Sequence, residues 1–197
     1  FKFLYFVIFT SVFVNMLFDK FDTFAFNQDD YIKLITTNTC QNCDLFRLDL
    51  THKDLTASIL DNAKMTDTDL TNTDFYFSSL KKASLNISNL TGANLSGANL
   101  SGANLSGANL FNADFSEADL SNANLTGANL TGAKFFKANL SRADLTNANL
   151  TRAILSDADI TRAIMTNANL NKAIMRNTNL SGSNLIRTDL SGANLLN

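Results

Sequence analysis

Large apolar residues recur at every fifth position from Leu45 to Leu195, in an unbroken series of 31 positions. The residue at each of these positions, here called the centre of a repeat, is usually Leu and otherwise Met, Phe or Ile, and none is polar. Residues 43–197 therefore divide into 31 five-residue repeats without an insertion. A fixed period of this length predicts a single repeat domain over 43–197.

The other four positions of the repeat are restricted as well. Two positions before the centre the residue is small in 29 of the 31 repeats, and the two exceptions are Leu48 and Lys53. The residue just before the centre is usually Asp or Asn, the residue after it is usually Ser or Thr, and all eight Gly occupy the last position. Gly tolerates the positive φ that many turns need, so this last position is predicted to lie in a turn.

A five-residue period fits neither regular element, because successive centres would spread around an α-helix and would alternate between the two faces of a straight strand. The chain must therefore turn once per repeat, with the centre and the small residue pointing inward. Phe75, Phe115 and Phe135 are separated by multiples of 20 residues. A coil with four sides of five residues places all three on one side, whereas a three-sided coil aligns only Phe75 with Phe135.

The consensus A-(D/N)-L-(S/T)-(G/N), seen in runs such as Ala93-Asn94-Leu95-Ser96-Gly97, resembles the pentapeptide-repeat family over residues 43–197. This resemblance implies an all-β protein: a right-handed, four-sided parallel β-helix. Residues 26–42 are expected to form the N-terminal cap. In that segment Asp29-Asp30, followed by Tyr31, Ile32, Leu34 and Ile35, predicts a short capped helix whose apolar face covers the first coil.

Residues 3–18 are apolar and uncharged and are preceded by Lys2, which is typical of an export signal. The run is shorter than a spanning helix needs, and Thr23-Phe24-Ala25 offers a cleavage motif, so residues 1–25 are interpreted as a signal peptide. The alternative is an uncleaved membrane anchor formed by residues 1–18.

The two cysteines, Cys40 and Cys43, lie where the cap meets the first repeat. A zinc site would need a second pair of ligands, and the sequence offers only His52, whose favoured interpretation is a solvated surface residue. A thioredoxin-type redox centre would need a βαβ setting. The third interpretation, which we favour, is a structural disulfide that attaches the cap to the first coil and requires an oxidising compartment. The segment 34–45 also resembles the entry segment of exported pentapeptide-repeat proteins, which implies the periplasm or the thylakoid lumen.

Charge is distributed unevenly along the chain. Residues 26–133 carry six basic and 12 acidic residues, a net charge of −6, whereas residues 134–197 carry eight basic and four acidic residues, a net charge of +4. Some family members inhibit DNA gyrase by imitating duplex DNA, which requires a negative surface along most of the length. The positive last third makes this function, and binding to nucleic acid, the less favoured interpretation.

The sequence contains one His, no Trp and no Gly-rich phosphate loop, so no enzyme, cofactor, metal or small-molecule substrate is expected. Among the outward-facing apolar residues, Ile154 and Ile174 are 20 apart and Phe136 lies close to the same column, which makes them the candidate contact patch. We therefore expect an exported structural or protein-interaction module with an unidentified protein partner. The opposed charges of the two ends also suggest end-to-end pairing of two copies.

Overall fold

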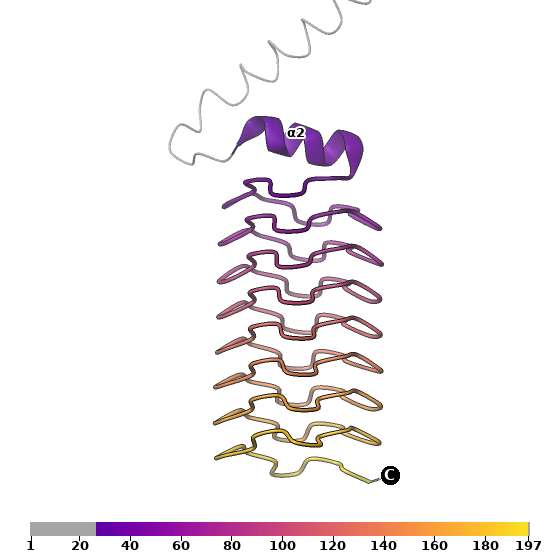
Figure 1. The fold of residues 1–197 in the computed structure, drawn as a ribbon, viewed down its shortest axis with the longest axis vertical. Coiled ribbons are helices and arrows are strands. Elements are labelled where there is room, and N and C mark those ends of the chain that lie inside the picture. Colours follow the sequence, from indigo (N-terminus) through magenta and orange to yellow (C-terminus); the bar gives the residue numbers. More distant parts are fainter. Residues whose placement is uncertain (1–26, 197) are drawn as a thin grey trace, which may run out of the picture.

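The computed structural model describes residues 27–196, in which one helix precedes a tower of stacked coils (Figure 1). The helix, α2, spans Gln28–Thr37 and lies across one end of the tower. The predicted signal peptide and membrane anchor lie outside the described residues. Within the described residues, no helix has the length and apolar character that a membrane span requires.

The tower is a four-sided, right-handed β-helix. Residues 20 apart form parallel bridges, such as Asp114 with Lys134 and Lys134 with Ile154, so each coil contains four repeats and the predicted number of sides is confirmed. Each repeat contributes a single bridging residue, and no extended strand occurs among residues 27–196. Five residues leave room for only a short extended piece between consecutive turns.

The repeats end in a turn in which the N–H three residues after the centre usually donates to the carbonyl of the centre, as Ala98 does to Leu95 at 3.1 Å. The last position has positive φ in every described repeat, as predicted from the Gly residues. Phe77 (φ 53°) and Ile87 (φ 62°) adopt this conformation as well, although it is unfavourable for bulky side chains. The next coil holds them there, since the Phe77 N–H donates to the Ser96 carbonyl at 3.1 Å.

The coils are joined by backbone hydrogen bonds and by a continuous apolar core. The Leu95 N–H donates to the Asp114 carbonyl at 2.7 Å, and the Asn94 N–H donates to the Thr73 carbonyl at 3.0 Å. Centres and small residues are fully buried through the middle of the tower. Phe115 and Phe135 stack with ring centroids 5.0 Å apart and an interplanar angle of 2°, as the shared column predicts.

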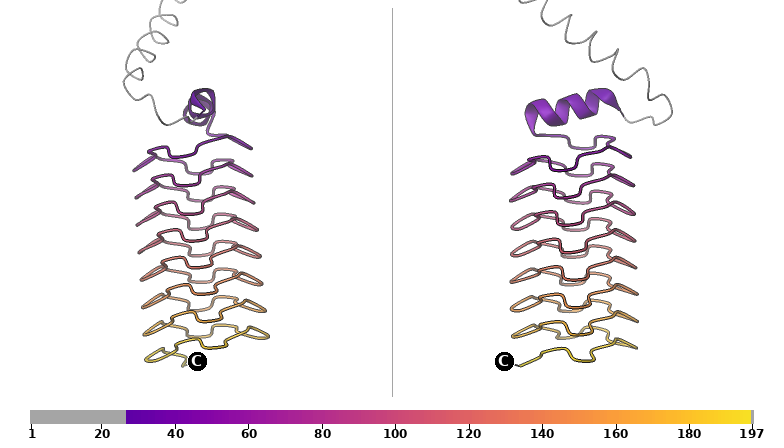
Figure 2. Two further views of the ribbon diagram at one scale, coloured as in Figure 1. Left: turned by 90° about the vertical axis from the view of Figure 1, so that its left-hand side faces the viewer. Right: turned by 180° about the vertical axis from the view of Figure 1, so that it is seen from behind.

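Helix α2 caps the first coil, but it differs in detail from the prediction. Its N-cap is Asn27, whose side chain accepts hydrogen bonds from the N–H groups of Asp29 and Asp30. Leu34 is buried, whereas Ile32 and Ile35 are 42% and 53% exposed. Helix α2 lies across the end of the tower (Figure 2), and the exposure of Ile32 and Ile35 shows that the expected apolar face is only partly covered. At the opposite end the centres of residues 176–195 are partly exposed, and end-to-end pairing stays a prediction.

Cys40 and Cys43 form a disulfide and are both buried. The bond joins Cys40 of the predicted cap segment to Cys43 of the first repeat and closes a four-residue turn. Contact with the cap comes from Asp30 of α2. Its carbonyl oxygen lies 3.1 Å from the Cys40 Sγ, and its carboxylate accepts the Asp44 N–H at 2.7 Å. The predicted disulfide is therefore present at the junction of cap and coil, and the contacts of Asp30 hold α2 itself against the first coil.

Candidate interaction face

One side of the tower, here called the mixed face, departs furthest from the repeat. It consists of two outward columns, the first running from Asp54 to Asn194 and the second from Thr56 to Leu196, in steps of 20, together with the turn residues on either side. In order from the cap, the first column holds Asp54, Asp74, Asn94, Asp114, Lys134, Ile154, Ile174 and Asn194.

The structure brings the predicted contact patch together on this face. Ile154 bridges to both Lys134 and Ile174, so these three residues stack in one column, and Phe136 occupies the neighbouring column. Phe136 and Ile174 are 39% and 38% exposed, and Ile154 is half-buried. Lys137 Nζ lies 5.1 Å from the Phe136 ring centroid, which places a cation over the aromatic ring.

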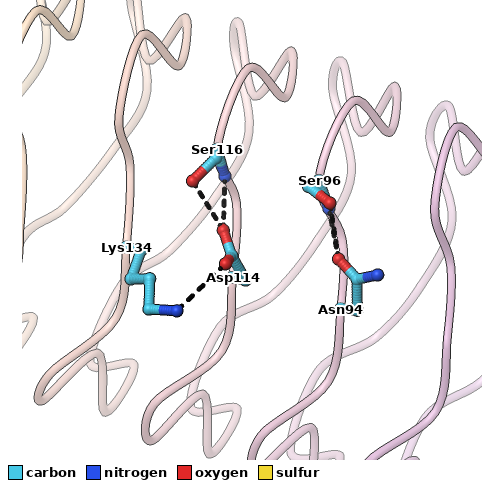
Figure 3. Close-up of polar contacts among 5 residues, drawn as sticks. All are labelled: Asn94, Ser96, Asp114, Ser116 and Lys134. Carbon is cyan, nitrogen blue, oxygen red and sulfur yellow. Dashed lines mark hydrogen bonds and ion pairs between the residues drawn. The ribbon is translucent and has the colours of Figure 1, made fainter.

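Between the patch and the cap, the mixed face keeps the Asp or Asn and the Ser of the repeat (Figure 3). The Asp114 carboxylate accepts the Ser116 N–H at 3.0 Å and the Ser116 hydroxyl at 2.6 Å, and its other oxygen pairs with Lys134 Nζ at 3.2 Å. Partial burial alone would raise the pKa of Asp114. The two hydrogen bonds from Ser116 and the Lys134 ammonium outweigh burial and hold the pKa below its ordinary value.

The positive charge of the last third is concentrated around the patch. Five basic residues border it: Lys134, Lys137, Arg152, Lys172 and Arg176. The five basic residues and the neighbouring Asp157 together carry a net charge of +4. This is the same as the net charge of residues 134–197 as a whole. The three remaining basic residues of this region are balanced by three Asp on other sides. Within residues 27–196, Lys134 alone of the five takes part in an ion pair.

The half of the mixed face nearer the cap has the opposite character. Asp54, Asp74, Asp114 and Glu117 are acidic, and beside them Tyr76 and Phe77 are 45% and 58% exposed. Their rings meet edge to face with centroids 4.5 Å apart. The sequence analysis did not place Tyr76 and Phe77 on the same face as the patch. The signal that could have done so is the step of 60 residues, or three coils, from Tyr76 to Phe136.

The remaining predicted positions do not belong to the patch. His52 is an exposed turn residue at the cap end of the mixed face, in the same turn column as Arg152 and Lys172. Among the described residues, the one group with metal-ligand spacing is Asp30, Cys40 and Cys43, but the two sulfurs are bonded to each other. Lys53 rims a cavity of about 360 Å³ between α2 and the first coil, and this position lets its amine reach solvent from a column that otherwise points inward.

The five-residue period of the tower matches the family model described as pentapeptide repeats, in eight copies over residues 40–75, 49–86, 88–127, 128–167 and 163–195. These matches together cover most of the chain. No curated protein sequence is significantly similar to it.

Solved structures of repeat proteins resemble the chain. HetL, a regulator of heterocyst differentiation from the cyanobacterium Nostoc, is 28% identical, and the match covers 86% of this chain and 97% of HetL, with a TM-score of 0.34. A pentapeptide-repeat protein of the Arabidopsis thaliana thylakoid lumen is 34% identical over 56% of this chain and 67% of its own, with a TM-score of 0.35. QnrB1, a plasmid-mediated fluoroquinolone resistance protein, is 18% identical over 77% of this chain and 91% of its own, with a TM-score of 0.36.

Proposed function

Since the chain belongs to the pentapeptide-repeat family, we propose that it is an exported, non-enzymatic interaction module. Its contact surface is the half of the mixed face that carries Lys134, Phe136, Ile154 and Ile174, and its ligand is a protein. The remaining sides of the tower serve as a rigid support that keeps this surface in one conformation.

The observation that supports this proposal is the replacement of Asn by Ile at two stacked outward positions. On the adjacent side, Asn149 and Asn169 occupy the equivalent places and form the same backbone bridges, so the coil itself does not need Ile. An Ile side chain at this position cannot make the hydrogen bonds that an Asn side chain makes there, and it exposes apolar surface to water. Apolar residues surrounded by cations are the composition of a contact surface with a polar rim.

Export is supported by two features that are independent of the mixed face. The disulfide between Cys40 and Cys43 persists in oxidising compartments, and the apolar run of residues 3–18 is typical of an export signal. Periplasm and thylakoid lumen both meet this requirement. Fusion of residues 1–30 to an export reporter tests this part, and a reporter that stays in the cytoplasm would overturn it.

Affinity capture from the native compartment tests the contact surface. The bait is the purified chain, compared with the double variant Ile154→Asn/Ile174→Asn, which introduces the residue that the repeat prefers. Ile164→Asn is the matched control, because Ile164 occupies the same repeat position on another side and is 43% exposed. We expect the double variant to lose the captured protein and the control to keep it. Equal capture by all three baits would contradict the proposal.

The second candidate function, regulation of a topoisomerase by imitation of DNA, has less support. A DNA-like surface is negative along its length, whereas the mixed face becomes positive from Lys134 onward. Inhibition of DNA supercoiling by the purified chain would favour this function over the first.

A further inference from the structure

The mixed face has two halves of opposite charge, and from this we infer that it is self-complementary. We propose that two copies of the chain pair face to face through it, with their tower axes antiparallel. The inference rests on the proposed role of the mixed face as a contact surface and names a second copy as its partner.

The two halves of the mixed face carry opposite charge. The half nearer the cap contains Asp54, Asp74, Asp114 and Glu117, and the other half contains the five basic residues around the patch, with Asp157 as the exception. Glu117 and Lys137 have no ion-pair partner within residues 27–196. Antiparallel pairing brings each acidic half against the basic half of the other copy, whereas parallel pairing would oppose like charges.

The 20-residue step fixes which residues meet. The proposed two-fold axis lies between the two copies, perpendicular to the tower axes, at a height midway between the levels of Phe115 and Phe135. It sets each column of one copy against the same column of the second copy, which runs in the opposite direction. Glu117 then faces Lys137 of the second copy, and two Asp114–Lys134 pairs meet at the axis. An axis at the level of Phe115 would instead oppose Glu117 to itself, and an axis at the level of Phe135 would oppose Lys137 to itself.

Side-chain size matches near the axis of the same register. Phe136 faces Ser116 of the second copy, and Ile154 faces Asn94, at the level where Ser96 and Gly97 are also small. Tyr76 faces Arg176, which permits a cation over the exposed ring. Farther from the axis the match is different, since Phe77 faces Asn177 and Ile174 faces Asp74.

The contact is modest in size. The six levels from Asn72 to Asn177, at about 4.8 Å each, form a contact roughly 29 Å long and one face wide. Such a contact lies at the small end of specific interfaces, so we expect a reversible dimer that forms at micromolar or higher concentration. Because charge steers it, added salt should weaken it.

Sedimentation velocity with charge reversal tests the pairing. Glu117→Lys and Lys137→Glu each create two like-charge contacts at the interface, and we expect either change to weaken the dimer by about tenfold or more. Combining both changes should restore it. Arg142→Glu is the matched control, because Arg142 is a basic turn residue with φ 60° on another corner, and it should leave the dimer unchanged.

Cross-linking tests the orientation. In the antiparallel register Ser96 faces Ser156 of the second copy, while within one chain the two residues are three levels, or about 14 Å, apart. Both native cysteines are in the disulfide, so engineered thiols react alone. The double variant Ser96→Cys/Ser156→Cys should form a covalent dimer under oxidation, and neither single variant should. Cross-linking of a single variant would indicate parallel pairing and overturn the proposal.

The outcomes separate this inference from the proposed function. A chain that stays monomeric up to hundreds of micromolar, or a dimer insensitive to both charge reversals, overturns face-to-face pairing. If a different protein is then captured and is lost with Ile154→Asn/Ile174→Asn, the mixed face remains a contact surface with another partner. A dimer that the double charge swap fails to restore also contradicts the proposed register.

Discussion

Two neighbouring sides of the tower share one backbone and one kind of interior but differ outside. The side next to the mixed face, here called the asparagine face, carries the outward column from Asp49 to Asp189, in which Asn fills five consecutive levels. Those levels are occupied by Asn89, Asn109, Asn129, Asn149 and Asn169. At three corresponding levels of the mixed face, Lys134, Ile154 and Ile174 replace the amide.

The asparagine face shows what the fold prefers at this position. The Asn129 side-chain amide donates to the Asn109 Oδ1 at 2.9 Å, and its own Oδ1 accepts the Thr131 hydroxyl at 2.8 Å. An Ile side chain can make neither bond. The comparison teaches that inward positions are dictated by packing, whereas outward positions can depart from the repeat, at small energetic cost, to serve another purpose.

The largest expected effect concerns the shared interior. Leu150 and Leu155 are fully buried centres behind the asparagine face and the mixed face. Leu150→Ala and Leu155→Ala should each lower the free energy of unfolding by about 2–5 kcal/mol, because each leaves a cavity of the same kind. Urea unfolding measures both values. A difference larger than about 1 kcal/mol between them would break the claim that the two interiors are equivalent.

Substitutions in the turns should have smaller effects on stability than those in the interior. Gly97 (φ 67°) lies at a turn of the mixed face, and an added Cβ would approach the Phe77 ring to 3.0 Å. Gly107 (φ 65°) has open space at the same place. Gly107→Ala should cost about 1–2 kcal/mol for the left-handed conformation alone, and Gly97→Ala should cost more, because the ring must move. Thermal unfolding of the two variants gives the difference, and equal values would show that the Phe77 ring moves freely.

Outward substitutions sharpen the contrast between the two faces. Asn129→Ala removes the amide bonds of the asparagine face and should lower stability by about 1 kcal/mol. Ile154→Asn on the mixed face should change stability by less than about 0.5 kcal/mol, because the substitution introduces the residue that the repeat favours. Chemical denaturation measures both. A large loss from Ile154→Asn would mean that this residue serves the fold rather than a contact.

The smallest effect is the pH dependence of the mixed face. The pKa of Asp114 is held below its ordinary value in the folded chain, so its contribution to stability is present above the unfolded-state pKa of about 3.9 and is lost as pH falls through the folded value. Asp114→Asn should flatten the loss of stability as the pH falls below about 4, by less than about 1 kcal/mol, because the ion pair is partly exposed. Asn129→Ala, which removes no charge, should leave that slope unchanged.

The repeat made most of the fold predictable. The five-residue period, the small-residue column and the Gly positions each have a direct physical cause, and the spacing of Phe75, Phe115 and Phe135 favours four sides over three. Phe115 and Phe135 do stack, while Leu95 separates Phe75 from them. The interior is predictable because one constraint acts 31 times.

The cap and the surface were less predictable because their residues do not follow the repeat. Asn27 rather than Asp29 or Asp30 caps α2, and Ile35 stays exposed, since the position of a helix on a coil end depends on contacts without periodicity. Ile87, at 65% exposure, was not recognised as an outward apolar residue. On the mixed face the stacking of Ile154 on Ile174 was predicted, whereas the position of Tyr76 in the column of Phe136 requires the 20-residue step to be followed over three coils.

The uniform length of the repeats has a consequence for how such a chain can change. Deletion of the five residues 123–127 would leave every later Leu inside, since Ala128 would take the place of Ala123. Everything after the deletion would turn by one quarter about the long axis, and Lys134, Ile154 and Ile174 would move under the acidic and amide residues of the asparagine face. A single in-frame loss of fifteen nucleotides could thus reassign a whole surface without disturbing the interior.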